Sequence, residues 1–181
     1  SVRSWVDAIS EHVRAIHPRL AWELSNGSAA EHAFIVTPEG DPAIRHLAVQ
    51  WLAQAPAPDA VWEYFASRQP GPLGSLLLDG VELDLAEYRA IVSWDSARAR
   101  VDVHLWHPSL DGASDDLRMR AAFLFLDNLL GEADVERWIG SIDLLDAPTG
   151  GRTPDELRAE VARRAAEPRE GNWTLGTFGD G

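Results

Sequence analysis

The sequence predicts an α+β fold, with an antiparallel sheet of about six or more strands and helices packed mainly on one face. The order of the patterns supports this prediction. An amphipathic helix, a hairpin and a second helix precede a run of strands, and further helices follow, without the strict strand–helix alternation of a doubly wound sheet. The 181 residues, 45% hydrophobic and 25% charged, suit one globular domain. We therefore expect one α+β domain over residues 1–167 and a Gly-rich tail over residues 168–181.

The first 40 residues predict a helix and a hairpin. Trp5, Ile9 and Val13 recur at helical spacing, and Pro18 closes the segment. Alternation in "LAWELSNG" and the following run "HAFIVTPEG" predict two strands joined by a loop that begins at Asn26-Gly27.

Residues 41–68 predict a helix and then a strand. Asp41 followed by Pro42 is typical of an N-cap and a first-turn proline, and "APAP" ends the apolar stripe of this helix. The run "VWEYFASR" alternates as a strand does.

Signals for two pairs of antiparallel strands lie between residues 75 and 107. Asp79-Gly80 stands between two apolar runs, which favours a two-residue hairpin turn. "YRAIVSWD" and "RVDVHLWH" are separated by a polar stretch, and they predict a further antiparallel pair.

The C-terminal part predicts helices with clear end signals. Ser114 is an N-cap, and "AAFLFL" is apolar all round, so we expect this helix to be the most buried one. Gly131 ends it, and "EADVERWIG" and "SIDLLD" predict a short helical turn and a short strand. Thr153 and Glu156 form a capping box that starts a last helix.

Composition excludes several classes of function. The net charge of −13 opposes nucleic acids and anionic membranes, and the arginines are scattered along the chain. The absence of cysteine excludes disulfides and Cys-based zinc sites. No apolar window is long enough for a membrane span and residues 1–20 resemble no signal peptide, so we expect a cytoplasmic protein of bacterial type. Two explanations of the negative charge are open: it keeps the protein soluble, or it forms an acidic face that binds a basic partner. No local run of carboxylates shows where such a face lies.

The stretch "RVDVHLWHPSL" contains the raw material of a metal or acid–base site. On a strand, Asp102 and His104 share one face and His107 lies on the opposite face, so the two histidines cannot hold one ion. Asp102 and His104 remain an alternative polar site. The chain contains no G-x-S-x-G, S-x-x-K or Walker motif, and we expect no metal and no cofactor.

Several segments resemble a family of small bacterial proteins of unknown function, over residues 18–145. They are "HPRLAWEL", "FIVTPEG", "VQWLAQAP", "VWEYFASRQP" and "LDNLLGEADVERWIGSID". The resemblance implies no catalytic residue, and it singles out these positions: Trp22, Glu23, Gly40, Ala55, Pro56, Trp62, Gly131 and Glu132. Turns and helix ends explain the glycines and Pro56. If Glu23 and Glu132 lie in one concavity with Trp22 or Trp62, that concavity is the candidate binding site.

Our leading hypothesis is a non-catalytic module that uses a Trp-rich surface to hold a protein partner or a second copy of itself. Eight Trp residues, the negative charge and the missing catalytic motifs support it. One version is an acidic protein that neutralises a partner, in the manner of an immunity protein. The candidate binding residues are Trp22, Glu23, Trp62, Glu132 and, in the tail, the expected anchors Trp173 and Phe178.

The alternative is a hydrolase-type enzyme whose carboxylates and histidines converge only in three dimensions. The two hypotheses differ in what they expose. A binding module predicts an exposed apolar patch. An enzyme predicts a closed pocket that contains groups of shifted pKa.

Overall fold

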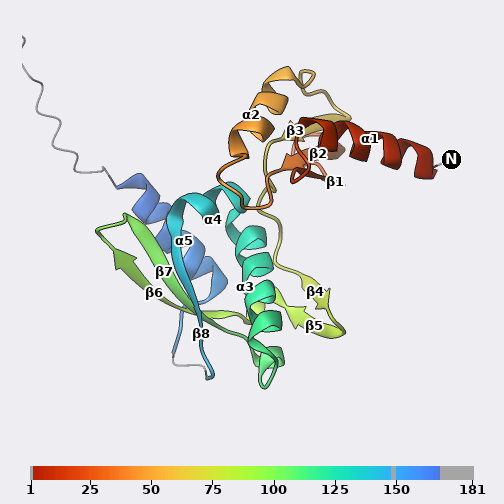
Figure 1. Cartoon of the computed structure of the whole chain (residues 1–181). Coiled ribbons are helices and arrows are strands. Elements are labelled where there is room, and N and C mark those ends of the chain that lie inside the picture. Colours follow the sequence, from red (N-terminus) through yellow and green to blue (C-terminus); the bar gives the residue numbers. More distant parts are fainter. Residues whose placement is uncertain (1, 148–149, 168–181) are drawn as a thin grey trace, which may run out of the picture.

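The computed structural model describes residues 2–147 and 150–167, and Figure 1 shows two lobes. The predicted mixture of α and β structure is confirmed, with five α-helices and three small sheets of three, two and three strands in this part of the chain. The prediction of one sheet of six or more strands is wrong, because the strands divide between two hydrophobic cores. We name residues 2–66 the N-lobe and residues 73–147 and 150–167 the C-lobe, joined by a linker over residues 67–72. None of the described helices is long and apolar enough to span a membrane.

The N-lobe is a three-stranded sheet with two helices. Its elements are α1 (Val2–Ile16), β1 (Ala21–Asn26), β2 (His32–Thr37), α2 (Arg45–Gln54) and β3 (Trp62–Phe65). The strand order is β1-β2-β3, and β1 and β2 form the predicted antiparallel hairpin. β3 pairs parallel to β2, because α2 carries the chain back across the sheet. The prediction of an antiparallel sheet is therefore wrong for β3.

Both helices of the N-lobe cover the same face of its sheet. The indole of Trp22 stacks on Phe34 at 5.8 Å between ring centroids, and Phe34 contacts Trp51 of α2 at 5.6 Å. The Trp22 Nε1–H donates to Ser10 Oγ of α1 at 3.0 Å. The opposite face carries Glu23 and Ile35, and it is directed toward the C-lobe.

The segment before α2 differs from the prediction. Asp41 caps a tight turn, with its Oδ1 accepting the Ala43 N–H at 2.9 Å, and the helix begins only at Arg45. Ile44 occupies the N-cap position and makes no side-chain capping bond. An Asp side chain can satisfy the N–H two positions on in a turn as well as cap a helix, and here the turn prevails.

The C-lobe contains a hairpin and a three-stranded sheet. Its strands are β4 (Ser75–Leu78), β5 (Val81–Asp84), β6 (Arg89–Asp95), β7 (Arg100–Trp106) and β8 (Ile139–Leu144), with 3₁₀ turns at Leu85–Glu87 and Pro108–Leu110. Asp79 and Gly80 turn the β4–β5 hairpin as predicted, with φ of 49° and 82°. β6 and β7 are antiparallel as predicted, whereas β8 lies parallel to β7 after a helical crossover.

Three helices pack on one face of the β6-β7-β8 sheet: α3 (Asp115–Leu130), α4 (Glu132–Trp138) and α5 (Pro154–Ala166). Ser114 caps α3 as predicted, accepting the Leu117 N–H at 3.3 Å. α3 has six buried residues, more than any other described helix, although Phe123 and Leu124 of its apolar run are 48% and 41% exposed. Only one side of α3 lies against the sheet, and its other side faces the N-lobe.

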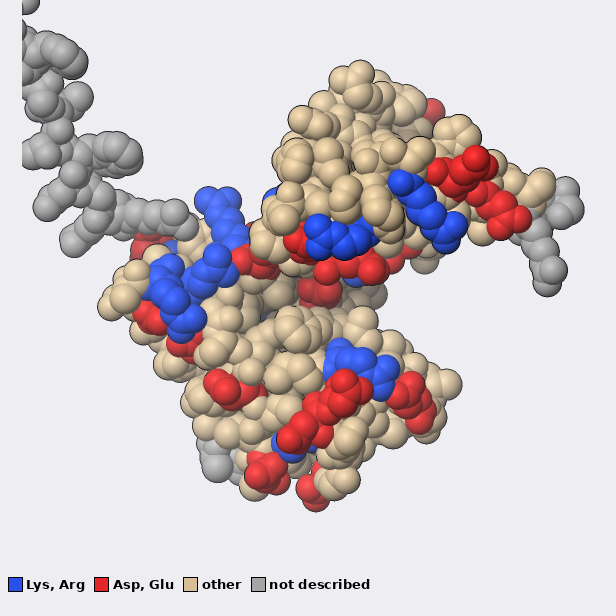
Figure 2. Space-filling view, viewed as in Figure 1, with Lys and Arg blue, Asp and Glu red and all other residues tan. Residues whose placement is uncertain are grey.

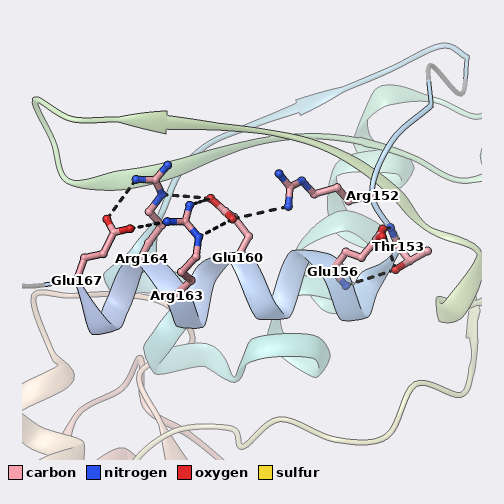
Figure 3. Close-up of polar contacts among 7 residues, drawn as sticks. All are labelled: Arg152, Thr153, Glu156, Glu160, Arg163, Arg164 and Glu167. Atoms are coloured by element: carbon pink, nitrogen blue, oxygen red, sulfur yellow. Dashed lines mark hydrogen bonds and ion pairs between the residues drawn. The ribbon is translucent and has the colours of Figure 1, made fainter.

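Figure 3 shows polar contacts within α5 and between this helix and the segment that precedes it. The predicted capping box is present, since Thr153 Oγ1 accepts the Glu156 N–H and the Glu156 carboxylate accepts the Thr153 N–H. Further along, Glu160 accepts hydrogen bonds from Arg163 and Arg164. The Arg164 guanidinium lies over the Trp94 ring of β6 at 4.9 Å, which links the helix to the sheet.

Candidate functional site

The two lobes enclose a cleft, visible as a hollow between them in Figure 2. It consists of two cavities of about 800 Å³ and 960 Å³, and both are lined by Arg68 of the linker and Asp127 of α3. The smaller cavity is walled by the face of the N-lobe sheet that lies away from α1 and α2, including the buried Ile35, and by Leu124. Phe123 lines the larger cavity. The cleft thus combines charged groups with exposed apolar side chains.

Glu132 joins the lobes at the bottom of this cleft. It is the first residue of α4 and only 2% exposed. Its carboxylate accepts hydrogen bonds from Thr37 Oγ1 at 2.5 Å, from the Gly40 N–H at 2.7 Å and from the Arg68 N–H at 3.1 Å. A buried carboxylate with three donors is satisfied in place, so Glu132 holds the N-lobe, the linker and the C-lobe together.

Gly131 allows the linker to pass close to α4. Its φ is +84°, a conformation that L side chains rarely adopt. A Cβ added there would lie 2.9 Å from Pro70 Cδ and 3.3 Å from the Arg68 carbonyl oxygen. The glycine that the sequence indicates as a helix end is therefore also a packing requirement of the linker.

Arg68 binds two carboxylates of the N-lobe. Its Nε donates to Glu23 at 2.9 Å and its Nη2 to Glu39 at 2.8 Å. Burial alone would lower the pKa of Arg68, but the hydrogen bonds to Glu23 and Glu39 raise it above its ordinary value. Glu23 and Glu132, singled out together in the sequence, do meet at Arg68, one at its side chain and the other at its backbone.

Asp127 is a different kind of carboxylate. Among the described residues, none donates a hydrogen bond to its side chain or forms an ion pair with it. Burial, followed by the charge of Glu132, raises the pKa of Asp127 from 3.8 to about 6, while Arg68 opposes the increase and Glu23 adds to it. Asp127 thus lies in the cleft as an acid that ionises near neutral pH.

The arrangement on α3 follows from helical spacing. Phe123 and Asp127 are four residues apart and line the same cavity, and Leu124 is three residues from Asp127 and lines the other. One turn of the helix therefore presents a carboxylate between an aromatic and an aliphatic side chain.

The charges at the cleft sum to a negative value. The carboxylates that line it are Glu23, Glu39, Glu63, Asp127, Glu132 and Glu136, and the guanidiniums that line it are Arg68 and Arg100, with Arg45 paired to Glu136 at its border. Arg45 pairs with Glu136, with an Nε–Oε1 distance of 2.8 Å. Arg100 donates to the carbonyl oxygens of Glu136 and Ile139. Two of the three cations are thus already occupied by carboxylates, and none of the three forms an ion pair with Asp127.

The predicted Trp residues lie elsewhere. Trp22 is adjacent to Glu23 on β1, and successive side chains of a strand point to opposite faces, so Trp22 packs under α1 and α2. Trp62 also lies on that face, 5.1 Å from the His32 ring. Trp5, at 44%, is the exposed indole among the described Trp residues. Trp173 and Phe178 lie outside the described residues.

Asp102 and His104 share a face of β7 but have separate partners. The Asp102 carboxylate accepts the Ser141 N–H at 2.7 Å and pairs with Arg98, whereas His104 lies 3.7 Å from Asp143. His107 is buried on the other side, with its Nε2 2.8 Å from the Asp84 carbonyl oxygen. Within residues 2–147 and 150–167, no group of three or more His, Asp or Glu side chains is placed to hold a metal ion.

Sequence reasoning missed Arg68, Asp127 and the role of Phe123. One signal was available for Asp127, because it is the lone charged residue of the run "AAFLFLDNLL". A carboxylate inside an apolar helical run needs either a partner or a solvated cavity. Arg68 carries no such signal, since it stands in a Pro- and Gly-rich linker whose path depends on both lobes.

Comparison of the chain with known protein families, with curated proteins and with solved structures finds no match. The cleft and its chemistry are therefore the basis for a functional proposal.

Proposed function

We propose that the protein is a non-catalytic binding module that holds a segment of a partner protein in the cleft between its lobes. The observation that carries this proposal is the pair of exposed apolar side chains, Phe123 and Leu124, on either side of Asp127. Apolar side chains around a few polar groups in a concavity are typical of binding sites. The net charge of −13 favours a protein over a nucleic acid as the partner.

The shape of the site supports a partner segment over a second copy of the chain. A two-fold dimer needs a surface that is complementary to itself, whereas a cleft accepts a protruding segment. The two cavities, of about 800 Å³ and 960 Å³, offer room for several side chains. Self-association remains the other form of the proposal, and light scattering distinguishes it: a dimer lost on substitution of Phe123 and Leu124 would identify a second copy as the occupant.

Selection of peptides from a phage-displayed random library tests the proposal. The targets are the wild type, the double variant Phe123→Ser/Leu124→Ser, and the control Leu77→Ser. Leu77 lies on β4, is 72% exposed and lines neither cavity. We expect peptides that bind the wild type and the control but not the double variant. Equal enrichment on all three targets, or none on any, would overturn the proposal.

Hydrolase activity is the second candidate, and one observation favours it. Burial and the neighbouring Glu132 raise the pKa of Asp127 to about 6, which suits a general acid or base at neutral pH. Against it, no histidine is among the described residues that line the cleft, and Glu132 is satisfied by three donors. Turnover of nitrophenyl ester, phosphate or glycoside substrates that Asp127→Asn abolishes would establish an enzyme.

A further inference from the structure

We infer that the partner segment is basic, with an Arg or Lys side chain that binds Asp127 while an adjacent apolar residue packs on Phe123. This inference rests on the proposed function and names its class of partner. It also gives a location to the acidic face that the overall charge of the chain suggests.

The first argument is charge complementarity. Six carboxylates and the guanidiniums of Arg68 and Arg100 line the cleft, and Arg68 and the neighbouring Arg45 are already paired with carboxylates. Arg68 donates to both Glu23 and Glu39 and forms no ion pair with Asp127, so its charge compensates that of Asp127 only in part. An acidic segment would be repelled by the uncompensated charge, and a basic segment would remove it.

The second argument is the setting of Asp127 on α3. Phe123 precedes it by one helical turn and is 48% exposed, and Leu124 lies on its other side. A guanidinium or ammonium group at the carboxylate would bring its methylene stem, or its charge, against these side chains. Apolar groups next to a carboxylate match the long side chains of Arg and Lys better than a small inorganic cation.

The third argument concerns protonation. The groups that face Asp127 are Glu132 from α4, Glu23 from β1 and Arg68 from the linker. These surroundings keep a fraction of the molecules protonated at Asp127 near pH 6. A cation bound beside Asp127 favours the ionised carboxylate, so its binding is weaker when the carboxylate is protonated. Lowering the pH from 7.5 to 5.0 protonates Asp127 before binding, so affinity for a basic segment falls by about tenfold.

The test uses three peptide pools of equal length in fluorescence anisotropy. In every pool, alternate positions contain randomised apolar residues. The positions between them are Arg or Lys in the basic pool, Gln in the neutral Gln pool, and Asp or Glu in the acidic pool. The proteins are the wild type, Asp127→Asn and the control Glu82→Gln. Glu82 is exposed on β5, lines neither cavity, and its substitution removes the same charge.

We expect the basic pool to bind the wild type and Glu82→Gln alike, and to bind Asp127→Asn about tenfold more weakly. Circular dichroism establishes that each variant is folded. Equal weakening by both substitutions would overturn the inference, because attraction would then arise from the total charge. If the Gln pool binds the wild type as tightly as the basic pool does, the inference is also overturned. If Phe123→Ser then weakens binding of the Gln pool, the proposed function still holds. If no pool binds, both fail.

Discussion

The two lobes differ in how they are stabilised. The core of the C-lobe contains nineteen buried apolar residues among those described, and that of the N-lobe contains five. Burial of apolar area is the main source of folding free energy, so the C-lobe is the more stable part. The N-lobe relies on its neighbour instead, since Thr37 and Gly40 donate to Glu132 of the C-lobe. One wall of the cleft, formed by α3, therefore belongs to the larger core, and the opposite wall belongs to the smaller one.

Asp127 and Glu132 show the same contrast at the level of two carboxylates. They are five residues apart, and one has three hydrogen-bond donors while the other has none among the described residues. Glu132 is buried and Asp127 is partly exposed, so the two carboxylates differ in burial as well as in their hydrogen-bond donors. For Glu132 the protein itself supplies the partners.

The largest effect is expected from the core of the C-lobe. Phe125 is fully buried and stacks on Tyr88 at 4.0 Å, so Phe125→Ala should lower the free energy of unfolding by about 4 kcal/mol. Urea denaturation measures this change. Phe123→Ala, two residues away on the same helix, is the matched control and should cost less than about 1 kcal/mol. Similar losses for both would contradict the assigned faces of α3.

Breaking the contact between the lobes should come next. Glu132→Ala leaves the buried Thr37 hydroxyl and the partly buried N–H groups of Gly40 and Arg68 without their acceptor, at a cost of about 3 kcal/mol. Hydrogen exchange should accelerate in residues 37–41 more than in β7. Glu136→Ala, which removes a more exposed ion pair with Arg45, is the control. Unchanged exchange in the N-lobe would show that it does not depend on Glu132.

The close approach of the linker predicts a smaller loss. Gly131→Ala combines a strained φ with a clash against Pro70 and should cost about 2 kcal/mol. Gly112 has a similar φ of +73° but open space around it, so Gly112→Ala should cost about 1 kcal/mol. Thermal unfolding of both variants separates conformational strain from steric contact. Equal losses would mean that the linker moves aside.

The smallest effect is a gain in stability. The pKa of Asp127 is raised to about 6 in the folded protein, so the folded state keeps its proton while the unfolded state loses it between pH 4 and 6. Stability therefore falls as pH rises through this window. Asp127→Asn should stabilise the protein by about 1 kcal/mol at pH 7, after allowance for partial exposure, and by nothing near pH 4. A pH-independent difference would contradict the shifted pKa.

Local signals in the sequence determined the elements of this protein. The Asp79-Gly80 turn and the caps at Ser114 and Thr153 are confirmed, because each depends on groups within a few residues of one another. Alternation along β1 also contained the answer for Trp22 and Glu23, since neighbours on a strand point to opposite faces. The hypothesis that Trp22 and Glu23 line the same binding site did not take this alternation into account.

Tertiary structure alone decided the topology and the cleft. The parallel placement of β3 and β8 depends on helical crossovers, and the division into two cores depends on which apolar faces meet. The resemblance singled out Glu23 and Glu132, but Arg68, where they meet, is visible only in the folded chain. Thr37 and Glu132 are separated by 95 positions. Contacts over such distances are set by the packing of whole lobes, and no short-range pattern in the sequence encodes them.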